Sequence, residues 1–270
     1  MKPFVRTVAG VLPTAFFSIL AGGCFVGIVD LDEADASWDK EATRLLTATV
    51  PVSTQIGVHV SGVNGEIRVL GVAGLQEVAV RAMKRVRSSS TADAAAHLSD
   101  IQVQIRSGAE EIQIETVQPH RSGHRDYIVD YEITVPGHFH VTGINANGAL
   151  FLEGVQAHLV VDAGNGDVTI REVEGSAWIS VGNGTVDASL VLPDGDQMVC
   201  AIGNGSMRLT VQREVSAELK ARVGNGTISV SGLNLVNPVS GPHMFHSQLG
   251  SGAGLIDLSV GNGTIQVWGG

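Results

Sequence analysis

LKARVGNGTISV at residues 219–230 and IDLSVGNGTIQV at residues 256–267 contain the pattern that decides the fold of this chain. In both stretches apolar and polar residues alternate up to a Gly-Asn-Gly tripeptide, and the alternation resumes beyond it. A period of two is typical of a β-strand with one buried face. Each copy therefore predicts two short strands joined at a corner, because glycine and asparagine tolerate the positive φ that a sharp change of direction requires.

This corner recurs along most of the chain. Apolar residues occupy 32 of the 35 positions six, four and two residues before, or three and five after, the corner asparagines. From the second corner onward the asparagine spacings are 18, 18, 21, 21 and 37, which indicates a repeat architecture. The last spacing is close to twice the first, and predicts a degenerate coil with an inserted loop over residues 237–254. The corner asparagines are Asn64, Asn147, Asn165, Asn183, Asn204, Asn225 and Asn262.

Two topologies fit this repeat. An Asn-Gly between alternating hydrophobic residues also suits the turn of an antiparallel hairpin, which would give a hairpin sandwich. A nearly constant period with the same residue at each corner favours a coil instead, because stacked asparagines can then form a hydrogen-bonded ladder. We therefore expect an all-β, single-domain parallel β-solenoid (β-helix-like), with short strands and Gly-Asn-Gly corners.

The composition limits the possible functions. Aromatic residues make up only 4% of the chain, so a core must be built from aliphatic side chains. The formal net charge is -10, which disfavours nucleic acid as a partner because phosphate binding needs clustered Lys and Arg. No motif indicates a cofactor, and we expect none.

The N-terminus has the features of an export signal. Lys2 and Arg6 precede an apolar stretch and a run of small residues that ends at Cys24. The sequence LAGGC at residues 20–24 resembles a bacterial lipobox, which implies removal of residues 1–23, lipidation of Cys24 and anchoring in a membrane. We expect residues 24–49 to form an acidic tether, with a short helical piece around residues 38–46, and residues 50–270 to form the β domain. The expected location is the bacterial cell envelope, at the outer membrane or cell surface.

Histidines supply the weak candidates for a metal site. His120, His124, His138 and His140 fall within 21 residues, and imidazole suits zinc, copper or nickel. No acidic or thiol ligand is spaced to complete a site, so we expect surface histidines rather than a metal centre.

A second candidate site is the insertion before the last repeat, because loops on a regular scaffold often carry binding function. Its candidate binding residues are His243, Met244, Phe245 and His246.

Catalytic residues are not apparent. Cys200 occupies an apolar position of its repeat, which predicts a buried thiol rather than a nucleophile. Asp167, Asp187, Asp194 and Asp257 occupy different repeat positions, so the paired carboxylates of a glycosidase do not emerge. We expect a protein that is not an enzyme.

The segments HVSGVNGEIRV (residues 59–69) and YEITVP (residues 131–136), with the serial GNGD, GNGT and GNGS copies, resemble the bacterial putative-adhesin domain, a family of unknown function. The resemblance covers residues 50–270 and implies a β-solenoid on an exported protein without catalytic residues. We therefore expect an adhesin-like scaffold that binds a polysaccharide or an envelope protein. Two alternatives remain open: a self-associating structural protein of the envelope, and a carbohydrate-active β-helix enzyme.

Overall fold

The computed structural model describes residues 25–28, 40–121 and 123–270. Eighteen strands join there into one hydrogen-bonded sheet. The helical elements of these ranges are α1 (Thr91–Ala96) and a single 3-10 turn at Leu98–Asp100. The all-β class expected from the alternating pattern is confirmed. Within the described ranges, no helix has the length and apolar character needed to cross a membrane.

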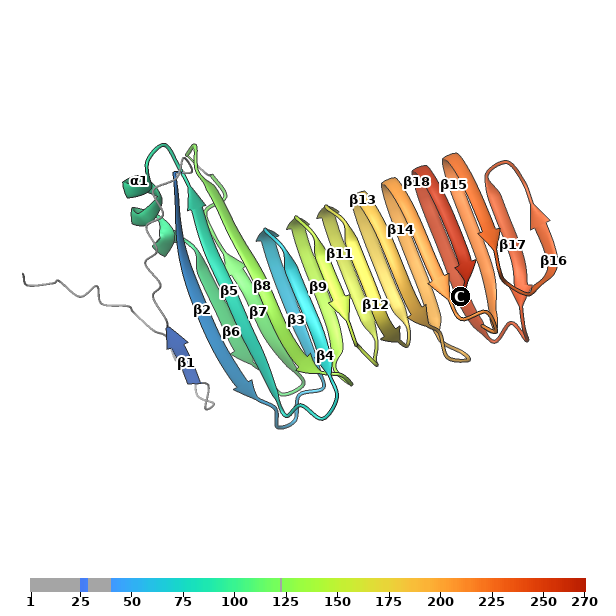
Figure 1. Cartoon of the computed structure of the whole chain (residues 1–270), viewed down its shortest axis with the longest axis horizontal. Coiled ribbons are helices and arrows are strands. Elements are labelled where there is room, and N and C mark those ends of the chain that lie inside the picture. The colour runs from blue at the N-terminus through green and yellow to red at the C-terminus, as the bar shows by residue number, and fades with distance from the viewer. Residues whose placement is uncertain (1–24, 29–39, 122) are drawn as a thin grey trace, which may run out of the picture.

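Strands that carry the corner pair side by side in parallel, and they are stacked along the long axis of the molecule (Figure 1). Equivalent positions pair: Asn183 of β13 (Ala177–Val191) lies opposite Asn204 of β14 (Gln197–Val211). From β13 onward one strand runs through the corner, whereas the expectation was two short strands. Earlier repeats do have separate strands before and after the corner: β3 (Gly57–Asn64) and β4 (Ile67–Val72), β9 (His140–Asn147) and β10 (Leu150–Glu153), and β11 (Leu159–Asn165) and β12 (Val168–Glu174).

The second glycine of the corner is required by the close stacking of neighbouring repeats. Gly205 has φ +146°, and a Cβ placed on it would lie 1.8 Å from the carbonyl oxygen of Gly184 in the adjacent repeat. A side chain at this position would therefore meet backbone that cannot move without disturbing the next repeat. This contact explains why glycine follows asparagine at every corner.

The chain order and the spatial order of the repeats differ at the C-terminal end. β18 (Gly254–Gly269) lies between β14 and β15 (Ala217–Ser231), and pairs in parallel with both. Residues 237–254 are therefore not a degenerate coil, as the doubled spacing suggested. Instead, β16 (Leu235–Ser240) and β17 (Met244–Leu249) form an antiparallel hairpin that extends the sheet beyond β15.

Both ends of the sheet contain antiparallel pairs, so the expectation of an entirely parallel arrangement is wrong, and the sheet is mixed. At the N-terminal end, β5 (Glu77–Arg87) runs antiparallel to both β8 (Asp126–Pro136) and β2 (Glu41–Pro51). β6 (Gln102–Ser107) is antiparallel to β7 (Glu111–Val117), which is in turn parallel to β3. Short turns can join antiparallel neighbours, whereas parallel neighbours need a crossover of the kind that each full repeat provides.

The β structure begins before residue 50, where the acidic tether was expected to end. β1 (Phe25–Ile28) pairs with β2, and β2 pairs with β5 from Glu41 onward. The helical piece expected around residues 38–46 is therefore wrong for residues 41–46, which are strand. The cause is tertiary: β5 supplies backbone partners along the whole of β2, which override a weak local preference. Cys24 and the expected signal, residues 1–23, lie outside the described residues.

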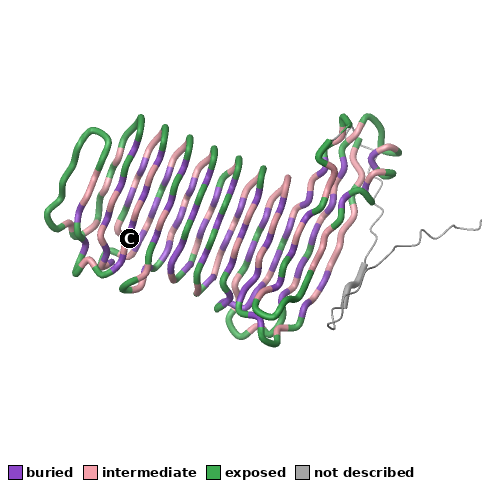
Figure 2. Tube along the Cα trace, turned by 180° about the vertical axis from the view of Figure 1, so that it is seen from behind, coloured by how far each residue is buried: buried purple, intermediate pink, exposed green. Residues whose placement is uncertain are grey.

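The core is mostly aliphatic and runs the length of the repeat stack. Buried residues alternate with more exposed ones along the corner strands (Figure 2), and the alternation changes phase across the corner. In β14, Met198, Cys200 and Ile202 point inward before the corner, and Met207 and Leu209 do so after it. The corner therefore lets one continuous strand present both of its halves to the same core.

Candidate functional site

The corner asparagines form one ladder along the edge of the repeat stack. Six of these asparagines each donate a side-chain amide hydrogen to the side-chain oxygen of the asparagine before them in space, at 2.8–3.0 Å. The order in space is Asn64, Asn147, Asn165, Asn183, Asn204, Asn262 and Asn225. At the N-terminal end, Asn64 Nδ2 donates to the Tyr127 carbonyl at 3.1 Å. The structure thus brings together all seven asparagines, and their side chains form hydrogen bonds with one another.

An exposed ring cluster lies on the outer face of the strands that precede the corner. His140 stacks on His158, with ring centroids 5.0 Å apart and planes 13° apart, and His158 contacts Trp178 at 6.0 Å between centroids. Trp178 is 38% exposed, and its neighbour Val160 in the paired strand is 41% exposed. We call these four residues the aromatic ledge. They lie on three consecutive repeats, so the ledge runs across the strands.

The ledge is held rigidly by the strands beneath it. Val160 pairs with Trp178 across β11 and β13, and the His158 N–H donates to His140 Nδ1 at 3.3 Å. Burial, and secondly the neighbouring His158, hold the pKa of His140 below its ordinary value. Two stacked imidazole rings beside an indole give a flat, largely apolar surface with a few polar edges. Such a surface suits the apolar face of a sugar ring.

Sequence reasoning missed the ledge, although the repeat contained a signal for it. His140 and His158 lie seven residues before their corner asparagines, and Val160 and Trp178 lie five before theirs. Residues at the same offset in consecutive repeats must stack, because the repeats pair in register. Comparing the outward-facing residues that lie at the same distance before each corner asparagine would have found the cluster.

A cleft of about 710 Å³ opens at the N-terminal end of the asparagine ladder. Asn64 and Asn147 line one side of it, and the segment 115–120 and residues 125–128 line the other. The Gln118 Oε1 atom is buried there without a hydrogen-bond partner among the described residues. The cleft forms where the chain passes from β7 to β8. Because β7 pairs with β3, before the corner, and β8 pairs with β4, after it, the loop between β7 and β8 has to cross the corner.

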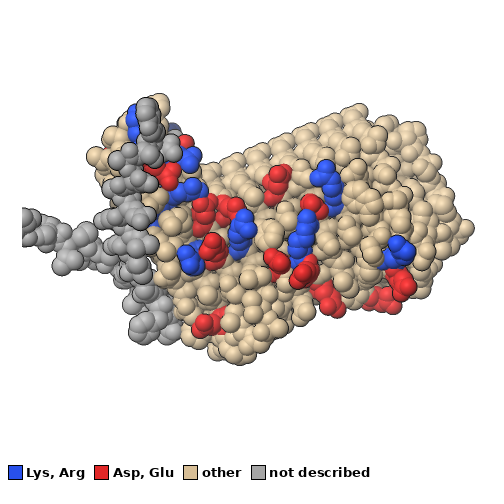
Figure 3. Space-filling view, viewed as in Figure 1, with Lys and Arg blue, Asp and Glu red and all other residues tan. Residues whose placement is uncertain are grey.

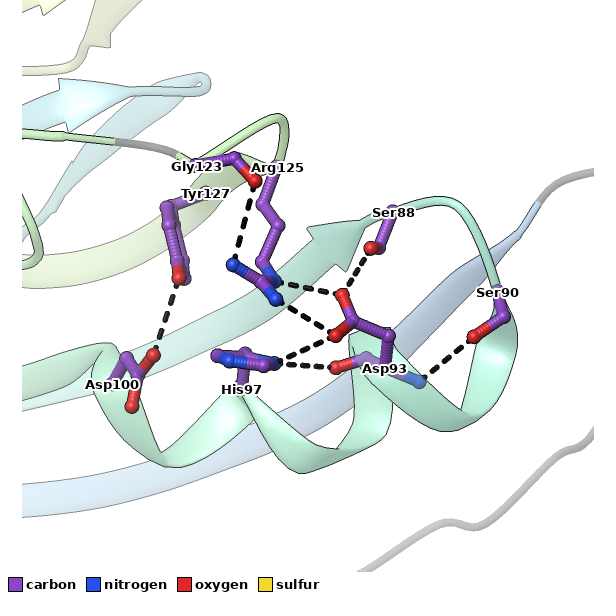
Figure 4. Close-up of polar contacts among 8 residues, drawn as sticks. All are labelled: Ser88, Ser90, Asp93, His97, Asp100, Gly123, Arg125 and Tyr127. Atoms are coloured by element: carbon purple, nitrogen blue, oxygen red, sulfur yellow. Dashed lines mark hydrogen bonds and ion pairs between the residues drawn. The ribbon is translucent and has the colours of Figure 1, made fainter.

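An ion-pair network fixes the wall of this cleft (Figure 4). Arg125 donates two hydrogen bonds of 2.7 Å to Asp93 of α1, and Tyr127 donates to Asp100 at 3.1 Å. The Arg125 guanidinium, with help from the Ser88 hydroxyl, holds the pKa of the Asp93 carboxyl well below its usual range. The network is structural, because it ties the β7–β8 loop to α1.

The four histidines proposed as weak metal candidates are not gathered into a site. No group of three or more His, Cys, Asp or Glu side chains in the described ranges is close enough to hold a metal ion. His120 lines the cleft, and His124 lies in a loop with φ +66°. His138 lies in the turn between β8, which ends at Pro136, and β9, which begins at His140. Phe139, which is buried between the two exposed histidines, anchors this turn in the core.

The segment proposed as a binding loop is strand rather than loop. Met244, Phe245 and His246 belong to β17, where His246 lies opposite Lys220 of β15. His246 Nε2 lies 3.0 Å from Glu218 Oε1, and Lys220 and His246 together lower the pKa of Glu218. His243, just before β17, accepts the Val223 N–H with its carbonyl at 3.0 Å. These residues therefore extend the sheet.

Cys200 lies in the core with an exposed fraction of 1%, and burial raises the pKa of its thiol strongly. Three repeat carboxylates are already engaged by neighbouring groups. Asp187 pairs with Arg171 at 2.8 Å, Asp257 pairs with Arg222 at 3.3 Å, and Asp167 accepts the Thr185 N–H at 2.8 Å. Basic and acidic side chains lie interleaved on the face in Figure 3, so neither sign of charge dominates it.

Comparisons with known proteins give distant structural neighbours. No protein-family model and no curated protein matches the chain. The structure is similar to "a putative cell adhesion protein" from Clostridium sporogenes, with 13% identity, coverage of 86% of this chain and 100% of the other, and a TM-score of 0.49. It is also similar to "a putative adhesin" from Bacteroides fragilis, with 14% identity, coverage of 83% and 97%, and a TM-score of 0.31. Likenesses at these values support no statement about ligand or activity.

Proposed function

We propose that this chain is an exported, lipid-anchored scaffold of the bacterial cell envelope that binds a polysaccharide at the aromatic ledge and has no catalytic activity. The observation that carries the proposal is the ledge itself. His140, Val160 and Trp178 lie on three strands that pair in register, and His158 directly precedes β11, so the four side chains form an exposed row. Exposed aromatic and apolar side chains on rigid elements are typical of binding surfaces.

A polysaccharide fits this surface better than a protein partner does. The ledge crosses the strands, which are spaced about 4.8 Å apart, so a repeating chain laid along the stack would meet the rings of successive repeats. Thr142 lies opposite Val160 in the paired strand, and a polar neighbour of this kind suits the hydroxyl groups of a sugar. The parallel coil that we assign to the corner repeats, a β-solenoid, would serve as the stiff support.

Export and anchoring rest on the sequence. The residues before Cys24 resemble a lipobox, and lipidation there would place the scaffold in the envelope, at the outer membrane or cell surface. The engaged carboxylates of the repeats support a role without catalysis, since Asp187, Asp257 and Asp167 already hold partners. No cofactor is part of the proposal.

The test is a glycan-array and envelope-polysaccharide screen with the purified chain, repeated with Trp178→Ala. We expect saturable binding that Trp178→Ala weakens about tenfold or more. An aromatic side chain that becomes buried beneath a ligand contributes at least ~1.4 kcal/mol to binding. Trp268→Ala is the matched control, because Trp268 is 37% exposed but lies after the corner of β18. Binding that survives Trp178→Ala would refute the ledge as the site.

The same screen separates the alternatives. A chain that binds no glycan but changes size with concentration in sedimentation would be a self-associating structural protein. Turnover of a uronate-rich glycan, lost when one acidic residue is replaced, would identify a carbohydrate-active enzyme.

A further inference from the structure

The two halves of the corner strands end differently at the C-terminal end of the stack. Before the corner, β15 is followed by β17 and then β16, which continue the sheet by two strands. After the corner, no strand in the described part of the chain pairs with the outer edge of residues 226–231. The core there lacks the layer that would face the hairpin.

Core residues at this end are only partly covered. Ile228 and Val230 occupy the positions of Ile265 and Val267, which are 0% and 1% exposed. Both nevertheless remain half-buried, and so do Leu235 and Phe245, which pack against the same end of the core. Half-buried apolar side chains therefore line the open edge of β15 after the corner.

The neighbouring edge is protected against strand pairing, whereas this one is not. β16 carries Pro238 and a register shift between Val236 and Val239, two features that block an edge strand. Residues 226–231, with the sequence GTISVS, contain neither proline nor charge. The difference indicates that the second edge is left open for a partner.

The asparagine ladder also stops at this point. Each of the other six corner asparagines accepts an amide from its neighbour, and Asn225 donates to Asn262 at 2.8 Å. The Oδ1 atom of Asn225 accepts from no asparagine of the described ladder. One further Asn-Gly strand would supply this donor, the missing backbone partners and a cover for Ile228 and Val230.

We propose that residues 225–231 are a docking edge for an extended segment of a partner protein, which adds in parallel as one more Asn-Gly-Thr strand. The chemistry of the segment follows from the opposite edge of β15, where residues 262–268 already pair in this way. The segment carries asparagine, then glycine, then uncharged residues that are apolar at every second position. Such addition of a strand to a sheet edge is a general mode of peptide recognition.

Geometry limits the length of the added strand. β17 occupies the edge of β15 at residues 217–222, and Val223 donates to His243. The docked segment therefore begins at its asparagine and spans only about seven residues. An interface this small belongs to the weak, transient class, and we expect a dissociation constant of about 10⁻⁵ to 10⁻³ M. The edge is separate from the aromatic ledge, so the inference does not depend on polysaccharide binding.

The test is fluorescence anisotropy with a labelled peptide of sequence NGTIQVW, a copy of residues 262–268, titrated with the full chain. We expect saturable binding that changes little with salt, because the edge is uncharged. Val230→Lys should weaken binding at least about tenfold by placing a charge among the half-buried apolar side chains of this edge. Val191→Lys is the matched control, since Val191 ends β13 with an exposed fraction of 47%. Far-UV circular dichroism and the unfolding midpoint of both variants establish that they are folded.

A second peptide tests the ladder contact. Replacing the asparagine by alanine removes one hydrogen bond to Asn225, and should weaken binding by about three- to tenfold. The proposal is overturned if NGTIQVW does not bind, or if it binds Val230→Lys as tightly as the wild type. It is also overturned if the wild-type chain dimerises through this edge and Val230→Lys does not, because the occupant would then be a second copy.

Discussion

Asn225 donates its side-chain amide to Asn262 at 2.8 Å, although the hairpin of β16 and β17 separates the two residues in the chain. The last strand is thus inserted into the stack rather than added to its end. β18 reaches the slot between β14 and β15 because the corner repeats offer interchangeable partners. Asn262 meets Asn204 on one side and Asn225 on the other, with the same register on both.

The ladder should contribute to stability in proportion to the bonds each asparagine makes. Asn204 makes two ladder bonds, to Asn183 and from Asn262, whereas Asn225 makes one. We expect Asn204→Ala to lower the free energy of unfolding by about 1–2 kcal/mol, and Asn225→Ala by about half of that. Urea unfolding of both variants measures the difference. Equal losses would mean that the ladder bonds are not the source of the effect.

Substitution of the second corner glycine should be far more costly than substitution of a glycine in a loop. Gly205→Ala places a Cβ 1.8 Å from the Gly184 oxygen, at φ +146°. We expect a loss of more than about 3 kcal/mol, or failure to fold. Gly195→Ala is the control, because Gly195 has φ +89° with nothing within 4 Å of the added Cβ. It should cost only about 1–2 kcal/mol, the strain of the backbone conformation alone. Thermal unfolding distinguishes the two.

Acidification should lower the stability of the folded chain through His140, a residue of the ledge. The pKa of His140 is lowered in the folded state from its ordinary value of 6.5. Below about pH 6.5, His140 of the unfolded chain therefore binds a proton more readily than His140 of the folded chain does. Stability is therefore complete above about pH 6.5, and falls as the pH drops toward the folded pKa.

The unfolding midpoint measured from pH 8 to pH 5 tests this dependence. His140→Gln should reduce the slope, and His138→Gln, which replaces an exposed histidine two residues away, should keep it. An unchanged slope in His140→Gln would assign the dependence to other groups.

Cys200 should not react with a thiol reagent in the native state. Its exposed fraction is 1%, and burial raises the pKa of the thiol, so little thiolate forms and the reagent has no access. With Cys24→Ser as background, we expect no reaction with 5,5′-dithiobis(2-nitrobenzoate) at pH 8 until urea unfolds the chain, and then one equivalent. Rapid reaction of the folded chain would place Cys200 at a surface.

The local pattern predicted much of the repeat. Alternation around each asparagine identified the inward residues of β14, including Cys200, and the all-β class follows from the same period of two. The corner glycines were likewise readable, because a sharp turn needs residues that tolerate positive φ. These features are local, since each depends on residues close together in the chain.

The arrangement of the repeats was decided only by the tertiary structure. Asn204 could stack equally well on Asn225 or Asn262, because both carry the same Gly-Asn-Gly-Thr corner, and the choice depends on how the hairpin routes the chain. β2 became a strand because β5 offered it a partner, against its own weak preference. The aromatic ledge required the in-register stacking that brings His140 against His158. The sequence by itself therefore determined the strands and their inward faces, which depend on short-range alternation. Long-range backbone pairing selected their neighbours, and so built the ledge and left one edge of the sheet open.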